Sequence, residues 1–326
     1  ILKLILSAQK LKRPMNLDKP IIQWILLLFL AFTWGSSFIL MKLGLESFND
    51  LQVASLRLVI STLFLSPIII KNFRKIKKDQ WLPILVAGLL GSGIPAFLFT
   101  KAQTQISSSL TGMLNSLVPL FTVVIGLLFF KMPFRLLKLL GAIVGLVGAI
   151  GLLSSSGGLS FENSKMSYAF LVVLATICYA TNVNFIKRFL KEVNSVNITA
   201  FGFLLIGPAA AIYLFSSDFT TILSENENAW QSLFYIALLA IFGTAIAVIL
   251  FNMLIKKVSP VFASSVTYII PIFAIFWGIL DGENVNISQF LFISIILTGV
   301  YIINQDNRLE RKAAAKKAKL QNTAID

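Results

Sequence analysis

The chain is built from apolar stretches that follow one another almost without interruption, each closed by a polar or charged break. A helix needs roughly 20 apolar residues to cross about 30 Å of hydrocarbon, whereas core helices of soluble proteins are shorter and amphipathic. The stretches fall at approximately residues 21–44, 51–70, 81–99, 106–130, 134–153, 167–189, 196–215, 230–254, 259–280 and 287–304. The sequence therefore predicts an all-α integral membrane protein with ten transmembrane helices.

The distribution of charge predicts the orientation of these helices. Of the 28 Lys and Arg residues, 24 fall on one side of the predicted bundle, and only Lys42, Lys101 and Lys165 fall on the other. Because cytoplasmic connections are rich in Lys and Arg, both termini are expected in the cytoplasm. The same asymmetry accounts for the net charge of +14 without a nucleic-acid partner.

Two pairs of segments show an internal repeat. Residues 110–126 (LTGMLNSLVPLFTVVIG) align with 262–278 (FASSVTYIIPIFAIFWG) at an offset of 152, and residues 34–42 (WGSSFILMK) align with 179–187 (YATNVNFIK) at an offset of 145. Each half then holds five helices, and because five is odd the halves must be inverted relative to one another. The connection after the fourth helix is accordingly basic (FFKMPFRLLK), whereas the one after the ninth is acidic (GILDGENVNISQ).

The predicted organisation has five parts. Residues 1–20 are expected to form a cytoplasmic segment, in which residues 1–14 precede the first methionine, Met15, and are open to interpretation as a non-native extension. A first five-helix repeat spans 21–153, an extracytoplasmic linker 154–166, a second five-helix repeat 167–304 and a basic cytoplasmic tail 305–326.

Three segments carry a resemblance to a known family. WGSSFILMKLGLESFNDLQVASLRLVIS, ISSSLTGMLNSLVPLFTVVIGLLFF and LFNMLIKKVSPVFASSVTYIIPIFAIFWGILDGE resemble EamA-type members of the drug/metabolite transporter superfamily, over about residues 24–304. The chain departs from that pattern after its fourth helix, where Lys131 and Met132 stand in place of a Gly-Glu pair that the second half keeps as Gly282 and Glu283. The resemblance implies a ten-helix carrier in a bacterial cytoplasmic (inner) membrane, often an exporter of amino acids or other metabolites.

Groups that catalysis or proton coupling would need are missing from the predicted spans. The chain has one cysteine, Cys178, and no histidine, so it forms no internal disulfide and no Cys/His metal site. No span carries Asp or Glu near its middle, where proton-coupled pumps usually hold an ionisable group. We therefore expect no enzyme, no cofactor and no buried proton relay, and leave facilitated diffusion, exchange and coupling through peripheral groups open.

Arg57 is the one cation well inside a predicted span. Such a residue can reach outward to the membrane surface or pair with Glu46 or Asp50, and it can also contact an anion in a permeation path. The structural role is favoured here over the functional one.

Uncharged polar and aromatic residues provide the candidate site. In hydrocarbon such groups must find partners within the bundle or line a wet cavity. A hydrogen bond between helices, worth about 0.6 kcal/mol on average, would account for any one of these residues taken singly. Their recurrence at equivalent positions of both halves instead predicts a substrate cavity at the midplane. The candidates are Trp34, Ser36, Ser37, Thr111, Asn115, Pro119, Tyr179, Thr181, Asn182, Asn252, Thr267, Tyr268 and Pro271.

Prolines and glycines in the spans have local roles. Pro119 and Pro271 remove backbone donors, so each can bend its helix or free carbonyl groups for a substrate. The fifth span carries Gly141, Gly145, Gly148 and Gly151, which favour close helix packing within the bundle or between two subunits. A homodimer therefore stays open, and membrane lipid is an expected partner.

The sequence favours a secondary transporter, and an exporter in particular, of small organic metabolites such as amino acids, working by alternating access. A multidrug exporter is the alternative within transport. A membrane-embedded enzyme lacks catalytic groups at depth, and a sensor would normally carry a soluble signalling domain; a channel would show neither saturation nor counterflow.

Overall fold

A computed structural model describes residues 19–132, 136–155, 165–258, 260–299, 301–302 and 305. The expectations for residues 1–18, for most of the linker and for nearly all of the basic tail lie outside this part. All regular structure in the described ranges is helical. The all-α prediction is therefore confirmed.

Eight described helices are long and apolar enough to cross a membrane. They are built from α2 (Pro20–Leu45), α3 (Asp50–Asn72), α4–η3–α5 (Trp81–Gly88, Leu89–Gly93, Ile94–Gln103), α6 and α7 (Ser108–Asn115, Val118–Phe129), α9 (Lys165–Phe189), α10 (Ser195–Ser216), α12–η4–α13 (Ala229–Leu238, Leu239–Ile246, Ala247–Lys257) and α14–η5–α15 (Pro260–Ser264, Ser265–Tyr268, Ile270–Leu280). The short elements η1 (Phe73–Lys75), η2 (Lys78–Gln80) and α11 (Phe219–Glu225) lie in the connections.

The fifth and tenth predicted spans correspond to shorter apolar helices. The fifth lies in α8 (Leu136–Ser155), with an apolar stretch at Leu139–Leu152, and the tenth is the helix Ile287–Gly299. The multi-span membrane fold is thus confirmed, whereas the count of ten stays a prediction.

Corresponding helices of the two repeats begin at corresponding residues. Asn49 caps the N-terminus of α3, and its side chain accepts a hydrogen bond from the Gln52 backbone N–H. Asn194 caps α10 in the same way by accepting from Val196 N–H. The offset of 145 that aligns residues 34–42 with 179–187 also places Asn49 on Asn194. These side chains satisfy N–H groups that an isolated helix start leaves open, so the repeat extends into the second helix of each half.

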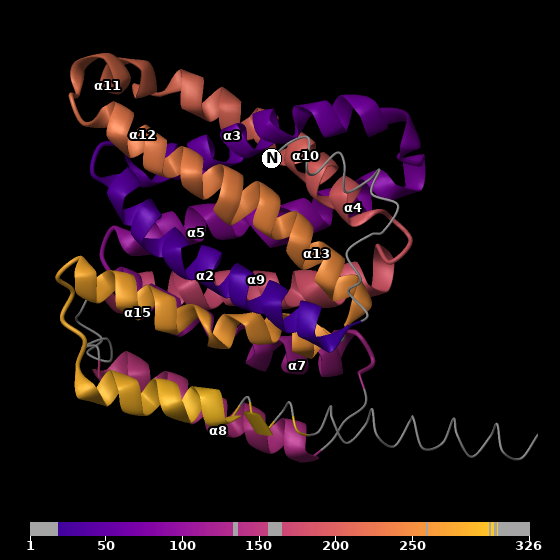
Figure 1. Cartoon of the computed structure of the whole chain (residues 1–326), viewed down its shortest axis with the longest axis vertical. Helices are drawn as coiled ribbons and strands as arrows, with labels where there is room; N and C mark the ends of the chain where they lie inside the picture. The colour runs from indigo at the N-terminus through magenta and orange to yellow at the C-terminus, as the bar shows by residue number, and fades with distance from the viewer. Residues whose placement is uncertain are drawn as a thin grey trace, which may run out of the picture.

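The two repeats run in opposite directions through one bundle (Figure 1). Helix α2 packs against α12 and α15, and its counterpart α9 packs against α5 and α7. Lys42 near the end of α2 pairs with Asp281. Lys187 near the end of α9 instead donates to the Lys256 carbonyl at 2.9 Å, at the opposite end of the bundle.

The ends of the bundle differ in charge. The acidic end, as we name it, comprises the connections 46–50, 101–107, 217–228 and 281–286, which hold all but two of the Asp and Glu residues in the described ranges. The basic end comprises 71–80, 131–132, 187–195 and 256–258, where Lys and Arg outnumber Asp and Glu. The charge pattern used to predict orientation is therefore present in three dimensions.

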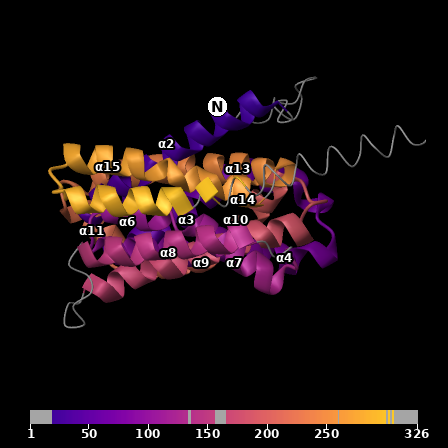
Figure 2. The ribbon, with the colours of Figure 1, turned by 90° about the horizontal axis from the view of Figure 1, so that it is seen from below.

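Helix α8 and the helix Ile287–Gly299 lie side by side at the edge of the bundle (Figures 1 and 2). The contact depends on glycines: a Cβ on Gly148 would lie 2.8 Å from the Ile296 backbone nitrogen, and one on Gly299 would lie 2.5 Å from the Gly141 carbonyl oxygen. The glycines predicted to support close packing thus do so within this chain, while a homodimer stays a prediction.

Candidate functional site

A cavity of about 80 Å³ lies between the two repeats. It has room for several water molecules or a small solute. Its lining includes Trp34, Ser37, Arg57, Asn115, Tyr179, Asn182, Asn252 and Thr267, with Phe38, Met41, Gly91, Phe99, Val118, Val183, Val248 and Phe251. A second cavity of about 20 Å³ shares Gly91, Asn182, Val248 and Asn252 with it and is also lined by Ile186, Ile198 and Thr199. Since Ile186 and Ile198 lie close to the basic end, the hollow continues in that direction.

The cavity lining follows the internal repeat. The offset of 145 pairs Trp34 with Tyr179 and Ser37 with Asn182, and all four side chains line the cavity. The offset of 152 supplies two further pairs of lining residues. Each inverted half therefore supplies equivalent positions to a shared site, as transporters with a midplane site do. The additional pairs are Asn115 with Thr267 and Phe99 with Phe251.

Two interrupted helices bring Asn115 and Thr267 to the cavity. Helix α6 ends at Asn115, and α7 then begins with Pro119 in its first turn. In the other half α14 passes into the 3₁₀ segment η5, and α15 begins with Pro271 in its first turn. Proline is tolerated in a first turn because its missing N–H has no partner there. The two prolines thus fix the interruptions, although neither lines the cavity.

The π-helical segment η4 supplies backbone acceptors to neighbouring helices. Trp34 Nε1 donates to the Gly243 carbonyl at 2.9 Å, and Ser61 Oγ donates to the Ala240 carbonyl at 2.9 Å. A π segment changes the partners of the helix carbonyls, and such segments are frequent at functional sites. The hydrogen bond from Nε1 therefore holds the indole ring of Trp34 in place. The ring also makes a T-shaped contact with Phe251, with ring centroids 5.0 Å apart.

Gly91 in the other π segment, η3, makes room for Asn182. A Cβ at Gly91 would lie 2.3 Å from Asn182 Nδ2, so a side chain here would displace the amide from the cavity. The ring of Tyr179 stacks on Phe99, with centroids 5.8 Å apart and an interplanar angle of 26°. Small and flat residues of α5 and η3 thus shape the wall formed by α9.

Arg57 occupies a different place from the one favoured by the sequence. Its side chain neither reaches an end of the bundle nor pairs with Asp50, which instead lies 3.6 Å from Lys101 Nζ. Arg57 is 8% exposed, lines the cavity, and donates from Nε to Thr244 Oγ1 at 2.6 Å. The guanidinium also interacts electrostatically with the Tyr179 hydroxyl. The expected structural role at the helix end is therefore wrong, because η4 and α9 offer polar groups at depth.

Three asparagine side chains leave polar atoms without partners at the cavity. The Oδ1 atoms of Asn115, Asn182 and Asn252 are buried and accept no hydrogen bond in the part of the chain that the structure describes. Asn252 Nδ2 donates to Thr199 Oγ1 at 3.0 Å, so that amide is anchored at one side. A buried polar group without a partner is costly, so these oxygens point to a ligand or water that completes them.

Six of the predicted site residues lie outside the cavity lining. Ser36 accepts from Trp277 Nε1 at 2.8 Å and joins α2 to α15. Thr111 and Thr181 donate to carbonyls one turn earlier in their own helices. The Tyr268 hydroxyl is buried without a partner among the described residues, at a place that neither cavity reaches. The others are Pro119 and Pro271.

The sequence prediction missed the apolar part of the wall and the role of Arg57. Phe38, Phe99 and Phe251 line the cavity but resemble any other aromatic residue of an apolar helix. The repeat offset of 152, which pairs Phe99 with Phe251, was the signal that could have singled them out.

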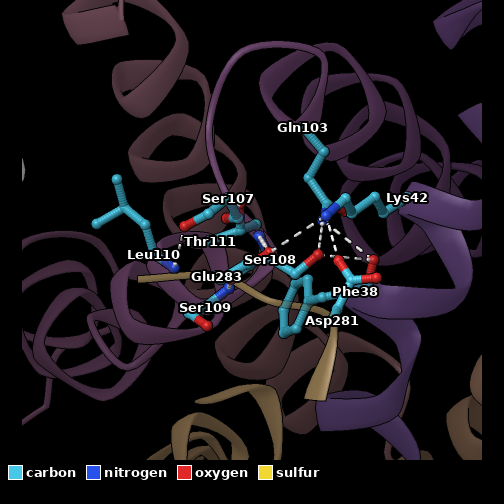
Figure 3. A network of polar contacts seen from close by, with 10 residues as sticks. All are labelled: Phe38, Lys42, Gln103, Ser107, Ser108, Ser109, Leu110, Thr111, Asp281 and Glu283. Atoms are coloured by element: carbon cyan, nitrogen blue, oxygen red, sulfur yellow. Dashed lines mark hydrogen bonds and ion pairs between the residues drawn. The ribbon is translucent and has the colours of Figure 1, made fainter. Parts of the chain in front are cut away.

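A polar cluster joins both halves at the acidic end of the bundle (Figure 3). Glu283 accepts from the backbone N–H groups of Ser108 and Ser109, at 2.8 and 2.9 Å, at the start of α6. Lys42 pairs with Asp281 and lies 4.0 Å from Glu283 Oε1. We call Lys42, Asp281, Glu283 and the first turn of α6 the acidic-end cluster; a carboxylate at a helix N-terminus satisfies open N–H groups and opposes the helix dipole.

The basic end lacks the matching carboxylate. Gly282 and Lys131 both adopt positive φ, at 79° and 54°, two residues after the ends of α15 and α7. The next residues donate in equivalent bonds, Glu283 N–H to the Gly278 carbonyl and Met132 N–H to the Gly126 carbonyl. Met132 thus occupies the place of Glu283, and its thioether is only a weak acceptor. The departure noted in the sequence makes the two ends of the bundle energetically unequal.

Metal binding finds no support in the described ranges, which contain no group of three or more His, Cys, Asp or Glu side chains placed to hold an ion.

Comparisons with known proteins agree with this architecture. An uncharacterised inner membrane transporter of Escherichia coli K12, YedA, is 28% identical over 282 residues, which are 84% of this chain and 88% of YedA. An S-adenosylmethionine/S-adenosylhomocysteine transporter of Chlamydia muridarum is 25% identical over 289 residues, covering 86% of this chain and 91% of that protein. A solved crystal structure with 18% identity covers 87% of this chain and 98% of its own, with a TM-score of 0.61, and supports the fold alone.

The family model of the EamA-like transporters matches residues 22–154 and 166–305, one match for each repeat. The chain is a multi-pass membrane protein with a transporter role, and it belongs to the EamA-like transporter family.

Proposed function

We propose that this chain is a secondary transporter that moves small organic metabolites, such as amino acids, across a bacterial cytoplasmic membrane by alternating access, with export as the net direction. The observation that carries the proposal is the cavity between the inverted repeats, to which equivalent positions of both halves contribute. Two similar halves can exchange conformations around such a site and so expose it to each side in turn.

The two ends of the bundle support this mechanism. The acidic-end cluster holds the halves together on one side, while the smaller second cavity extends the hollow toward the basic end. With the basic end in the cytoplasm, as the charge rule predicts, this conformation would receive a substrate from the cytoplasm. The export direction rests on the family resemblance.

A multidrug exporter is the alternative, favoured by the aromatic lining. Trp34, Phe38, Phe99, Tyr179 and Phe251 offer broad apolar faces to a flat lipophilic molecule. The three unpartnered asparagine oxygens favour a polar metabolite, because a lipophilic drug would leave them unsatisfied.

Counterflow in proteoliposomes tests the proposal. Vesicles that contain the full chain are preloaded with a mixed pool of amino acids and related metabolites, and labelled candidates are added outside one at a time. We expect accumulation of at least one label, and loss of that accumulation in Asn115→Ala, whose amide lines the cavity. Thr298→Ala, on the exposed face of the helix Ile287–Gly299, is the matched control and should transport normally.

The outcomes separate the candidate functions. No accumulation of any label, with folded and inserted protein, would contradict a metabolite carrier and favour lipophilic drugs, which the same assay can then examine. Accumulation that survives Asn115→Ala would place the transport path elsewhere. Export is tested in cells by measuring whether expression lowers the internal concentration of the identified solute.

A further inference from the structure

The cavity carries one buried positive charge and no negative one. Arg57 is the charged side chain in its lining, and neither cavity is lined by Asp or Glu in the described ranges. No ion pair to Arg57 forms within those ranges either, since the carboxylates at the acidic end pair with Lys42 and Lys101. An ionisable residue inside a membrane is costly and points to a function. The charge is therefore available to a ligand.

The guanidinium has donors left for that ligand. A guanidinium carries five N–H groups, and the Nε hydrogen is used on Thr244 Oγ1 at 2.6 Å. The Tyr179 hydroxyl is the other polar side chain that interacts with it. The planar fork of Arg matches a carboxylate, which it can bind through two parallel hydrogen bonds.

The repeat explains why there is only one such charge. The offset of 145 places Arg57 on Gly202 in the second half. A Cβ on Gly202 would lie 3.3 Å from the Cα of Gly88. A side chain at this position would press against the backbone of α4, so the close contact between α4 and α10 favours glycine over a second cation. The lining is thus symmetric in its aromatic and amide groups and asymmetric in charge.

The neutral groups define the rest of the ligand. Ring faces of Trp34 and Tyr179 suit a flat apolar body. The oxygens of Asn115 and Asn182 suit a hydroxyl or another neutral donor. Attraction between opposite charges is strong in such a buried site, and an unpaired charge is costly there. A monoanion would neutralise the cavity, whereas a zwitterion or a cation would leave a net positive charge and a dianion a negative one.

We propose that the substrate is a small monocarboxylate with a flat apolar body and a neutral hydrogen-bond donor, held by its carboxylate on Arg57. The inference rests on the proposed transport function for its setting, and it selects among metabolites by charge. Within the metabolites of the proposed function it favours organic acids over the amino acids named there, because zwitterions and amines of the same shape would bind Arg57 more weakly.

Three probes of one shape and different charge test this inference. They are 3-phenyllactate (net −1), phenylalanine (zwitterion) and 2-phenylethylamine (+1), titrated calorimetrically into the purified full chain. We expect 3-phenyllactate to bind about tenfold or more tightly than phenylalanine, and 2-phenylethylamine to give no measurable binding. Equal or tighter binding of phenylalanine, or no binding of 3-phenyllactate, would overturn the proposal.

Variants identify the charge responsible. Arg57→Gln should remove the preference for 3-phenyllactate, while Arg57→Lys should keep the order with weaker binding, because a lysine retains the charge without the fork. Arg74→Gln, which removes an exposed guanidinium at the basic end, is the control. A preference that survives Arg57→Gln in folded protein would also overturn the proposal.

Counterflow measured on the same preparation separates this inference from the proposed function. Charge-selective binding without counterflow of any solute would contradict transport and retain the anion site. Counterflow of other solutes with the wrong binding order would retain transport and reject the anion site.

Discussion

Glu283→Gln should weaken closure at the acidic end of the bundle. Glu283 is almost fully buried and accepts from the Ser108 and Ser109 N–H groups at 2.8 and 2.9 Å. Hydrogen bonds to charged groups contribute about 1.5–3 kcal/mol each, and a charge at a helix N-terminus adds about 0.3–1 kcal/mol. A glutamine keeps one acceptor oxygen but loses the charge and the second acceptor. We expect the closed state to lose about 2 kcal/mol of stability relative to the open state. This lowers the ratio of closed to open molecules roughly 30-fold.

Thiol labelling measures this change. Cys178 is the only cysteine in the sequence, so Cys178→Ala with Ser37→Cys leaves one thiol, at the cavity wall. A membrane-impermeant methanethiosulfonate is added from the side of the acidic end, and its reaction rate with this thiol is compared in the presence and absence of Glu283→Gln. We expect the rate to rise roughly 30-fold, in line with the population change.

Two comparisons make the result specific. Glu227→Gln removes an exposed carboxylate at the same end and should leave the rate unchanged. Lys42→Gln breaks the pair with Asp281, but Lys42 is 41% exposed, so its effect should stay within about fivefold because exposed ion pairs contribute about 0–1 kcal/mol. A rate for Glu283→Gln within about twofold of the parent, in folded protein, would refute the proposed role of the acidic-end cluster.

Two further predictions concern packing and the cavity wall. Gly112→Ala should lower the thermal unfolding midpoint, because the new Cβ would lie 2.3 Å from Ala274 Cβ and overpacking of about 1–3 kcal/mol outweighs the gain of about 1 kcal/mol in helix propensity. Gly145→Ala should not lower it, since the new Cβ would lie 4.0 Å from Leu120 Cδ1; equal midpoints for the two variants would contradict this prediction. Asn182→Ala should reduce substrate counterflow at least about tenfold, because it removes an amide from the cavity wall. Thr181→Ala should leave counterflow unchanged, since Thr181 donates to a carbonyl of its own helix. A larger loss in Thr181→Ala than in Asn182→Ala would place the site on another face of α9.

The repeat seen in the sequence predicted much of the site, because equivalent positions of inverted halves must meet at their shared interface. Trp34 with Tyr179 and Asn115 with Thr267 were candidates on that ground, and the structure places all four at one cavity. The repeat could not predict which of Ser36 and Ser37 lines the cavity, because both are small polar residues on one helix. The side chain that faces the cavity depends on how α2 packs against its neighbours.

Arg57 shows where sequence reasoning reached its limit. A cation about two turns into a span can extend to the end of the helix or bind a buried partner. Its position in the sequence is compatible with both arrangements and does not distinguish them. Arg57 stays buried because the π-helical segment η4 places Thr244, a residue 187 positions away, within hydrogen-bond distance of its Nε.

The amino-acid sequence alone predicted the membrane fold, the inverted repeat and the unequal charge of the two ends. Those features follow from the length of apolar stretches, from the odd number of predicted helices in each half and from counts of Lys and Arg, all of which are local along the chain. Which polar groups share the cavity, and the contact of Glu283 with the start of α6, became visible only in the three-dimensional structure. Those contacts join residues 174 and 175 positions apart, and they depend on helix rotations and crossings that no periodicity within a single apolar helix specifies.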